Sequence, residues 1–128
     1  MGRIRTNIKI GQKNFWTLFD SGARNTYIIE EIARELTTIV LKNPRPVSLG
    51  GETHNVVQTS LLECEIEGLP IEDNALVLNR IGIDDEGKKI EVIIGALTMQ
   101  RWGINLNLVE EKLDMTNYPK EFVEFLNI

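Results

Sequence analysis

Apolar and polar residues alternate strictly along two separate stretches of this chain. In residues 3–10 every second side chain can face a core, and in the stretch that begins at Thr59 glutamates alternate with apolar residues over residues 62–67. A period of two is typical of a β-strand with one buried face and one wet face. The side chains expected to face inward are those of Ile4, Thr6, Ile8, Ile10, Leu62, Cys64 and Ile66. Such strands, separated by glycine turns, predict a mostly β fold: a small closed β-barrel with two or three short helices.

Shorter patterns predict the remaining elements. Pro44 and Pro46 should end the region before them, because the residue that precedes a proline is pushed out of the helical conformation. Two glycines between extended runs predict a hairpin turn at residues 50–51. We expect strands at residues 15–19, 27–29, 71–78, 88–94 and 104–109, and short helices at residues 30–36 and 96–101.

The length of 128 residues fits a single domain, 1–128. Its core is expected to span about residues 3–109, followed by a C-terminal tail at 110–128. Phe122, Phe125 and Leu126 lie at helical spacing in that tail, which we therefore expect to be partly helical.

The charge balance and the cysteine content limit the classes of function. A count of 14 Lys+Arg against 19 Asp+Glu gives a net charge of −5, which argues against a nucleic-acid partner. No apolar run approaches the ~20 residues needed to span a membrane, and the first residues lack the apolar stretch of a signal peptide. Cys64, the single cysteine, can form neither an internal disulfide nor a cysteine-based metal site. We expect a cytoplasmic protein without a metal or another cofactor.

One predicted strand ends in a carboxylate. The apolar residues 15–19 lead directly to Asp20, and Ser21 and Gly22 then break the strand. Gly22 allows a sharp turn or a close backbone approach that a Cβ would block. Ser21 supplies a hydroxyl that can bond to nearby backbone groups. The sequence therefore predicts an acid at the tip of a strand, where backbone N–H groups can turn back toward it.

Three stretches, taken in order, resemble the motifs of one protease family. Asp20-Ser21-Gly22-Ala23, followed by Thr26, resembles the active-site loop of aspartic proteases. Leu49-Gly50-Gly51 stands where that family has the tip of a flap hairpin, and Val92-Ile93-Ile94-Gly95 resembles its second signature. The length of the chain is similar to that of the single-lobe branch, the retropepsin-like aspartic proteases.

The resemblance implies an aspartic endopeptidase that acts as a homodimer on an extended peptide or protein. Peptide hydrolysis by carboxylates uses two of them, one to take a proton from water and one to protonate the carbonyl oxygen. The chain contains a single Asp-Ser-Gly, so Asp20 would meet its own copy across a two-fold axis. Two carboxyl groups in contact cannot both be ionised, so they share one proton. The resulting pKa values belong to the pair and not to either residue.

The resemblance also implies roles for the neighbouring residues. Ser21 would clamp the two active-site loops together across the dimer axis, and Gly22 and Ala23 would let the substrate backbone approach. In the second signature, the strand residue Ile94 leads into Gly95, which would pack behind the loop.

The implied lid is the glycine hairpin. Leu49, Gly50 and Gly51 would fold over the substrate and exclude water. Glu52 follows these glycines, where viral relatives are more apolar. The second signature often continues Gly-Arg-Asp or Gly-Arg-Asn, but here Ala96-Leu97-Thr98 follows Gly95. Glu52 bears on how the lid closes and on which substrate. The missing arginine and the helix-like tail indicate a dimer interface built differently from that of retroviral enzymes.

Other interpretations compete with catalysis. A non-catalytic dimeric module with the same fold could grip extended peptides without cutting them, and a protease could be restricted to one partner or to its own precursor. His54 is expected to be an exposed flap residue, and Cys64 a buried structural thiol. Residues 84–86, all acidic, are expected to form a solvated turn rather than a calcium loop. Trp16 and Trp102 are expected in the core.

Overall fold

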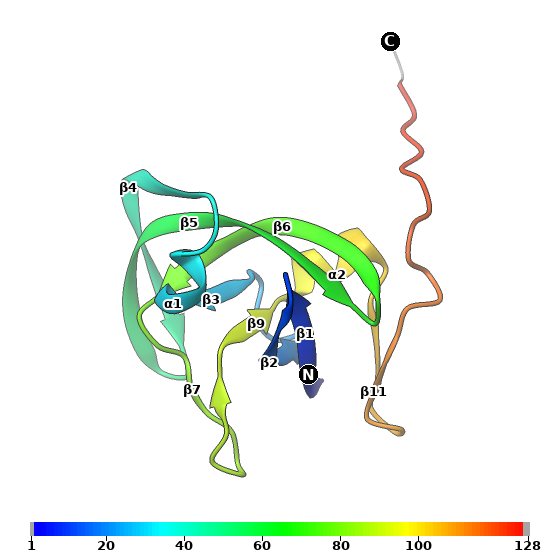
Figure 1. Ribbon diagram of the computed structural model, residues 1–128, viewed down its shortest axis with the longest axis horizontal. Coiled ribbons are helices and arrows are strands. Elements are labelled where there is room, and N and C mark those ends of the chain that lie inside the picture. The colour runs from blue at the N-terminus through cyan, green and yellow to red at the C-terminus, as the bar shows by residue number, and fades with distance from the viewer. Residues whose placement is uncertain (1, 127–128) are drawn as a thin grey trace.

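The computed structural model describes residues 2–126, and the fold is mostly β (Figure 1). The strands of the main sheet are β1 (Arg3–Ile10), β2 (Lys13–Asp20), β3 (Tyr27–Ile29), β4 (Thr38–Leu49), β5 (Glu52–Ile66), β6 (Leu69–Leu78) and β9 (Val92–Ile94). Their spatial order is β1-β2-β9-β3-β6-β5-β4. The sheet curls until β1 also pairs with β5, through Lys9 and Glu65. The predicted fold class is confirmed, and the ring closes through this single residue pair.

Smaller elements decorate the ring. The two-stranded sheets are β7 (Gly82–Ile83) with β8 (Lys89–Ile90), and β10 (Asn105–Asn107) with β11 (Lys112–Asp114). The helices are α1 (Glu30–Ala33) and α2 (Ala96–Trp102). None of the helices within residues 2–126 is long and apolar enough to cross a bilayer.

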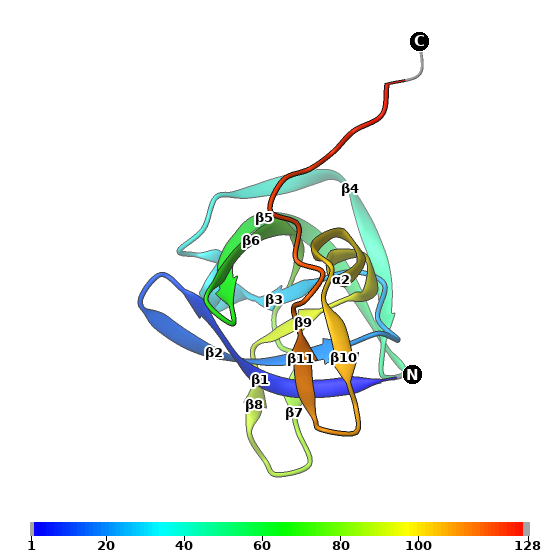
Figure 2. The ribbon, with the colours of Figure 1, turned by 90° about the vertical axis from the view of Figure 1, so that its right-hand side faces the viewer.

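Strand β9 lies between β2 and β3, which are far closer to each other in the sequence (Figure 2). It runs parallel to β2, with Phe19 opposite Ile94, and antiparallel to β3. Both strands of the parallel pair therefore end at the same edge of the sheet. The residues that follow them, Ser21 and Gly95, emerge there as neighbours.

Apolar side chains form two clusters on the two faces of these strands, since Ile28 and Ile94 belong to one and their neighbours Tyr27 and Ile93 to the other. The larger fills the ring and includes the fully buried Phe19, Ile28 and Ile94. The expected inward positions Leu62, Cys64 and Ile66 are buried, and the glutamates between them are exposed. The smaller cluster joins the β4–β5 hairpin to the turn after β2, and contains Ala23, Tyr27, Val56, Leu76, Leu78, Ile90 and Ile93.

The expected break at Pro44 and Pro46 is wrong, because β4 continues through both prolines. The strand lies at the edge of the sheet and pairs only with β5. A proline is tolerated at such an edge, where its missing N–H would have faced solvent. The register shifts between Val40 and Arg45, so a bulge also absorbs the irregularity.

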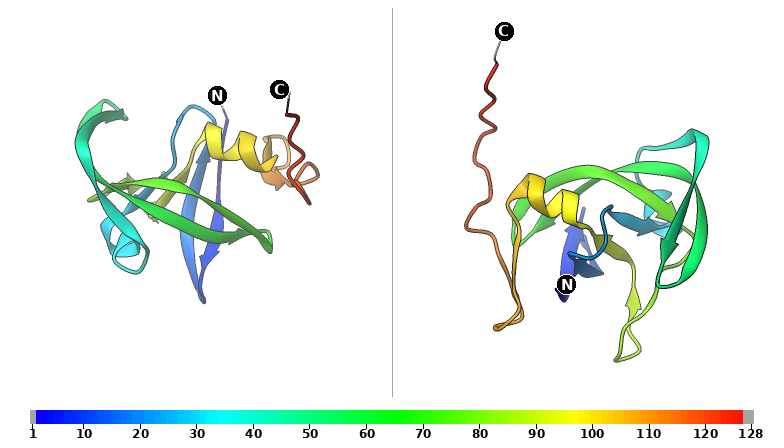
Figure 3. Two further views of the ribbon diagram at one scale, coloured as in Figure 1. Left: turned by 90° about the horizontal axis from the view of Figure 1, so that it is seen from above. Right: turned by 180° about the vertical axis from the view of Figure 1, so that it is seen from behind.

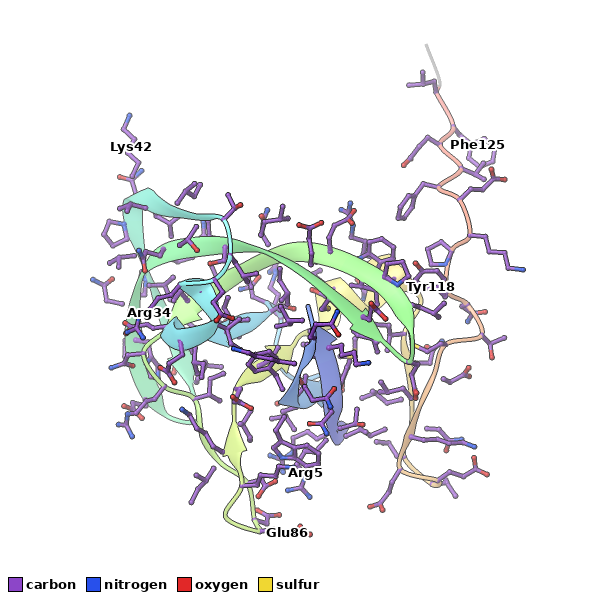
Figure 4. All side chains as sticks on the ribbon, in the orientation of Figure 1. Arg5, Arg34, Lys42, Glu86, Tyr118 and Phe125 are labelled. Atoms are coloured by element: carbon purple, nitrogen blue, oxygen red, sulfur yellow. The ribbon has the colours of Figure 1, made fainter. Side chains whose placement is uncertain are left out.

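The C-terminal tail differs from its prediction. Residues 115–126 contain no helix, and the remaining tail residues, 127–128, lie outside the described part. The core also extends beyond residue 109, since Leu113 is buried and Tyr118 stacks on Trp102 with ring centroids 5.8 Å apart. Phe122 also contacts Trp102, and beyond it the tail leaves the body, at the end opposite the β4–β5 hairpin (Figure 3). Tyr118 lies beside α2, whereas Phe125 points into open space (Figure 4).

Three predicted elements are shorter than expected. The first helix ends at Ala33, and the strand expected at 104–109 reduces to β10, which turns back into β11. The strand expected at 88–94 divides at Glu91. The two parts have different partners, because β8 pairs with β7 whereas β9 pairs with β2 and β3. At Glu91 itself, the N–H donates to the Trp16 carbonyl and the carbonyl accepts from Ile29.

Candidate active site

Asp20 is the last residue of β2, and its side chain is half-buried at the sheet edge. The Gly22 N–H donates to its carboxylate Oδ1 at 2.8 Å, and the Ala23 N–H donates to its carbonyl at 3.1 Å. This short turn holds the carboxylate in one orientation while leaving Ser21 and Gly22 exposed. We call residues 20–26 the Asp20 loop.

Ser21 ties the Asp20 loop to the start of the chain. Its Oγ accepts from the Gly2 N–H at 2.9 Å, and its own N–H donates to the Gly2 carbonyl at 3.0 Å. Within one chain the hydroxyl is therefore engaged by the residue that precedes β1. A shallow groove of about 560 Å³ runs beside it; its lining includes Gly2, Ser21, Met99, Ile104 and Leu106.

The start of α2 packs directly against the Asp20 loop. The Ala96 N–H donates to the Ala23 carbonyl at 2.7 Å, and the Leu97 N–H donates to the Arg24 carbonyl at 3.1 Å. A Cβ on Gly95 would lie only 2.1 Å from the carbonyl oxygen of Asn25, so no larger residue fits. Gly95 therefore lies behind the loop, at the position the resemblance implies.

A row of buried hydroxyl groups connects this contact to β6. The Gly95 N–H donates to Thr26 Oγ1 at 3.1 Å, Thr26 and Thr98 Oγ1 are 2.6 Å apart, and Thr98 donates to Asp73 Oδ2 at 2.8 Å. An ionised carboxylate only accepts, and each hydroxyl has one proton to donate. The donors therefore point from Gly95 through Thr26 and Thr98 toward Asp73. Sequence reasoning missed Asp73, for which no local pattern gives a signal.

The glycine hairpin forms as predicted between β4 and β5, with Leu49 opposite Glu52. Gly50 and Gly51 have φ values of +57° and +80°, the left-handed pair required by the commonest two-residue hairpin turn. Leu49 packs on the apolar cluster that contains Ala23 of the Asp20 loop. Glu52 forms an ion pair with Arg80 at 3.2 Å, and both side chains are exposed.

The burial of the cysteine, the histidine and the two tryptophans can be compared with what the sequence predicted. Cys64 is a buried thiol, and burial raises its pKa to about 12, as expected of an inert structural cysteine. His54 is half-exposed on β5. Trp102 is buried, but Trp16 is only partly so. Within residues 2–126 no cluster of His, Cys, Asp and Glu could hold a metal ion.

The acidic turn after β7 is only partly solvated. Asp85 is 96% exposed, as expected, but the Asp84 side chain is 3% exposed, which corrects that part of the prediction. Its carboxylate accepts from the backbone N–H groups of Glu86 and Lys88 and from the Trp16 indole N–H at 2.8 Å. The Lys88 and Trp16 bonds, chiefly, hold the pKa of Asp84 below its usual value.

Comparison with known proteins defines the fold. No protein-family model matches the sequence, and no curated protein matches it. The retroviral protease-like domain of Ddi1 from Leishmania major superposes with a TM-score of 0.63 and 19% identity, over 91% of this chain and 90% of that domain. EIAV protease in complex with the inhibitor HBY-793 gives a TM-score of 0.54 and 21% identity, over 84% of this chain and 94% of that protease. The chain therefore has the retropepsin-like fold.

Proposed function

We propose that this chain is an aspartic endopeptidase that acts as a homodimer. Each protomer would contribute one Asp20, one carboxyl acting as the base toward water and the other as the acid toward the peptide carbonyl. The chain has one Asp-Ser-Gly, so a second copy is the economical source of the second acid. The two carboxyls would share a proton, since both cannot be ionised at contact distance.

The observation that carries this proposal is the orientation of Asp20 at an open edge of the sheet. The Gly22 N–H bonds to Oδ1 at 2.8 Å, and the neighbouring Ser21 and Gly22 are exposed, so a second copy can approach the carboxylate. The Asp20 loop is braced from behind by Gly95 and Ala96, which supports a preorganised catalytic group.

The substrate would be an extended peptide lying between the Asp20 loop and the β4–β5 hairpin. Such a peptide is recognised through its backbone, with alternate side chains entering pockets. The hairpin tip has the geometry of a lid, because its two glycines turn in open space and its base packs on the same apolar cluster as Ala23. EIAV protease, whose fold is similar, is a protease in complex with the inhibitor HBY-793, which supports a protease site in this fold.

The test compares the parent protein with Asp20→Asn on a peptide library between mildly acidic and neutral pH. We expect the parent to cleave, and the variant to lose about 10³-fold or more of kcat/KM, because an amide cannot serve as acid or base. Asp114→Asn is the matched control, since it makes the same change at an exposed position on β11.

Assembly gives a second readout. For a weak dimer, specific activity should rise with protein concentration, in parallel with the dimer fraction measured by sedimentation. Cleavage by a strictly monomeric protein, or cleavage that Asp20→Asn retains, would contradict the proposal. Peptides that bind without being cut would instead identify a non-catalytic module with the same fold.

A further inference from the structure

The outer face of the β1–β2 pair carries two arginines beside Asp20. In the antiparallel register Arg3 lies opposite Asp20, and Arg5 lies opposite Leu18. Residues directly opposite each other project from the same face of a sheet. Both arginines are exposed, whereas Ile4 between them is buried. A cation is therefore the cross-strand neighbour of the proposed catalytic carboxylate.

The two arginines differ in their partners. Arg5 approaches Asp84 at 4.0 Å and Asp85 at 3.8 Å, and it points toward the turn that carries Glu86 (Figure 4). Within residues 2–126 no ion pair involves Arg3. Arg5 is therefore paired with the acids of the β7–β8 turn, whereas the guanidinium of Arg3 remains available to a ligand.

A groove of about 220 Å³ lies on this face, which we call the Arg3 groove. Its apolar lining comes from Leu18, Ile83 and Ile90, and its charged lining includes Arg3 and Arg5. Both arginines also line a second groove, whose lining includes Trp16, Glu86 and Glu111. It contains two exposed glutamates, whereas the Arg3 groove contains one exposed acid, Asp85, so the Arg3 groove is the better receptor for an anion.

The acids that line the Arg3 groove do not cancel Arg3. Asp84 is almost fully buried and its carboxylate is already satisfied by two backbone N–H groups and the indole of Trp16. Asp85 is fully exposed beside Arg5. An aliphatic stem could lie on Leu18 and Ile90 while a carboxylate at its end meets the Arg3 guanidinium, which suits bidentate contact.

We propose that Arg3 determines substrate specificity by selecting peptides with a glutamate beside the bond that is cut. Arg3 can act in this way only if the proposed function is correct, because its neighbour Asp20 then marks the site of cleavage. In a two-fold symmetric dimer each protomer supplies one Arg3 groove, so the preference should occur on both sides of the cleaved bond. The net charge of −5 disfavours acidic peptides at long range, so such a preference would have a local cause.

The experiment uses pairs of peptides that differ only in glutamate or glutamine next to the cleaved bond. We expect the parent to cut the glutamate peptide with a kcat/KM about tenfold higher, the effect of one charge-assisted hydrogen bond. Arg3→Gln should abolish the preference, so that the variant cuts the glutamate and the glutamine peptide at equal rates. Lys9→Gln is the matched control, because it removes the same charge from the same strand about 20 Å away.

Two results would overturn the role of Arg3: equal rates for both peptides with the parent, or a preference that survives Arg3→Gln. Circular dichroism of Arg3→Gln checks that the variant is folded. A binding measurement separates this inference from the proposed function. Fluorescein-labelled peptide pools with either glutamate or glutamine at one fixed position are titrated with the Asp20→Asn variant. Tighter binding of the glutamate pool, lost in the Asp20→Asn/Arg3→Gln double variant, supports Arg3 even if the parent cuts nothing, and equal affinity contradicts it.

Discussion

The Asp20 loop and the tip of the β4–β5 hairpin are both glycine turns, yet they are held in opposite ways. The Asp20 loop accepts hydrogen bonds from Ala96 and Leu97 of α2, and its backbone packs closely against Gly95, which lies behind it. At the hairpin tip, a Cβ on Gly50 or Gly51 would meet no atom within 4 Å. The Asp20 loop is packed against the start of the chain and against Gly95 with α2, whereas the two hairpin glycines are held by the strands that lead into them.

The comparison separates two reasons for a glycine. At Gly95 the reason is space, because a backbone carbonyl occupies the place of a side chain. At Gly51 the reason is the backbone angle, because φ is +80° and the surroundings are empty. Local opening costs little where buried contacts are few, so the hairpin tip can move while the Asp20 loop stays fixed. That division suits a lid over a rigid catalytic carboxylate.

The contrast predicts that, of the substitutions considered, Gly95→Ala lowers the free energy of unfolding most. Its Cβ would lie 2.1 Å from the Asn25 carbonyl oxygen, so the Asp20 loop or α2 must shift, and the free energy of unfolding should fall by about 3 kcal/mol or more. Gly51→Ala meets only an unfavourable backbone angle and should lose about 1 kcal/mol. Urea denaturation of both variants measures the two costs.

Equal losses for the two alanine variants would break the contrast. Activity sharpens it further, because Gly95→Ala displaces Asp20 and should lower kcat, whereas Gly51→Ala alters only the proposed lid. If Gly95→Ala were as stable as the parent, the close packing of α2 against the Asp20 loop would be wrong.

An intermediate effect is expected where the hydroxyl row braces the Asp20 loop. Thr98→Val keeps the shape but removes a hydroxyl bonded to both Thr26 and Asp73, so a buried donor loses its partner. The free energy of unfolding should fall by about 2 kcal/mol. Thr98→Ser keeps the hydroxyl and is the matched control. A Thr98→Val protein as stable as Thr98→Ser would show that the row adds nothing to the bracing.

Much of the fold could be predicted because the strands are recognisable from short stretches of alternating apolar and polar residues. The alternation in β1 and β5 depends only on which face is buried, and the burial of Ile4, Ile8 and Cys64 follows it. The tail shows the limit of periodicity. Phe122 and Phe125 have helical spacing, but a helix gains most of its stability from packing an apolar face. Only Phe122 reaches a partner, Trp102, with ring centroids 5.3 Å apart.

The candidate site, too, could be predicted only where its residues are close together in the sequence. The residues of the Asp20 loop and Gly95 form short motifs, and their positions could be read from consecutive residues. Asp73 could not be found in this way, because it belongs to β6 and meets Thr98 only through the curvature of the ring. The place of Arg3 beside Asp20 likewise depends on the exact pairing of β1 with β2.

The smallest expected effect is the response of the β7–β8 turn to acid. In this turn, as in the Asp20 loop, a carboxylate accepts hydrogen bonds from nearby N–H groups. Asp84 accepts from Lys88, Trp16 and Glu86, which lowers its pKa below the ordinary value of 3.8. A lowered carboxyl pKa contributes stability that is fully present above the unfolded value and is lost as the pH falls through the folded value. Below pH 3.8, protonation should therefore weaken the bond to Trp16 and loosen the β7–β8 turn.

Nuclear magnetic resonance can follow this change through the two indole N–H signals. The Trp16 signal should shift as the pH falls below 3.8, because its acceptor is the Asp84 carboxylate. The Trp102 signal is an internal control, because its acceptor, the Glu72 carbonyl, does not titrate. In Asp84→Asn the Trp16 signal should lose its acid shift. If Trp16 kept that shift in the variant, a group other than Asp84 would cause it, and the likeness to the Asp20 loop would fail.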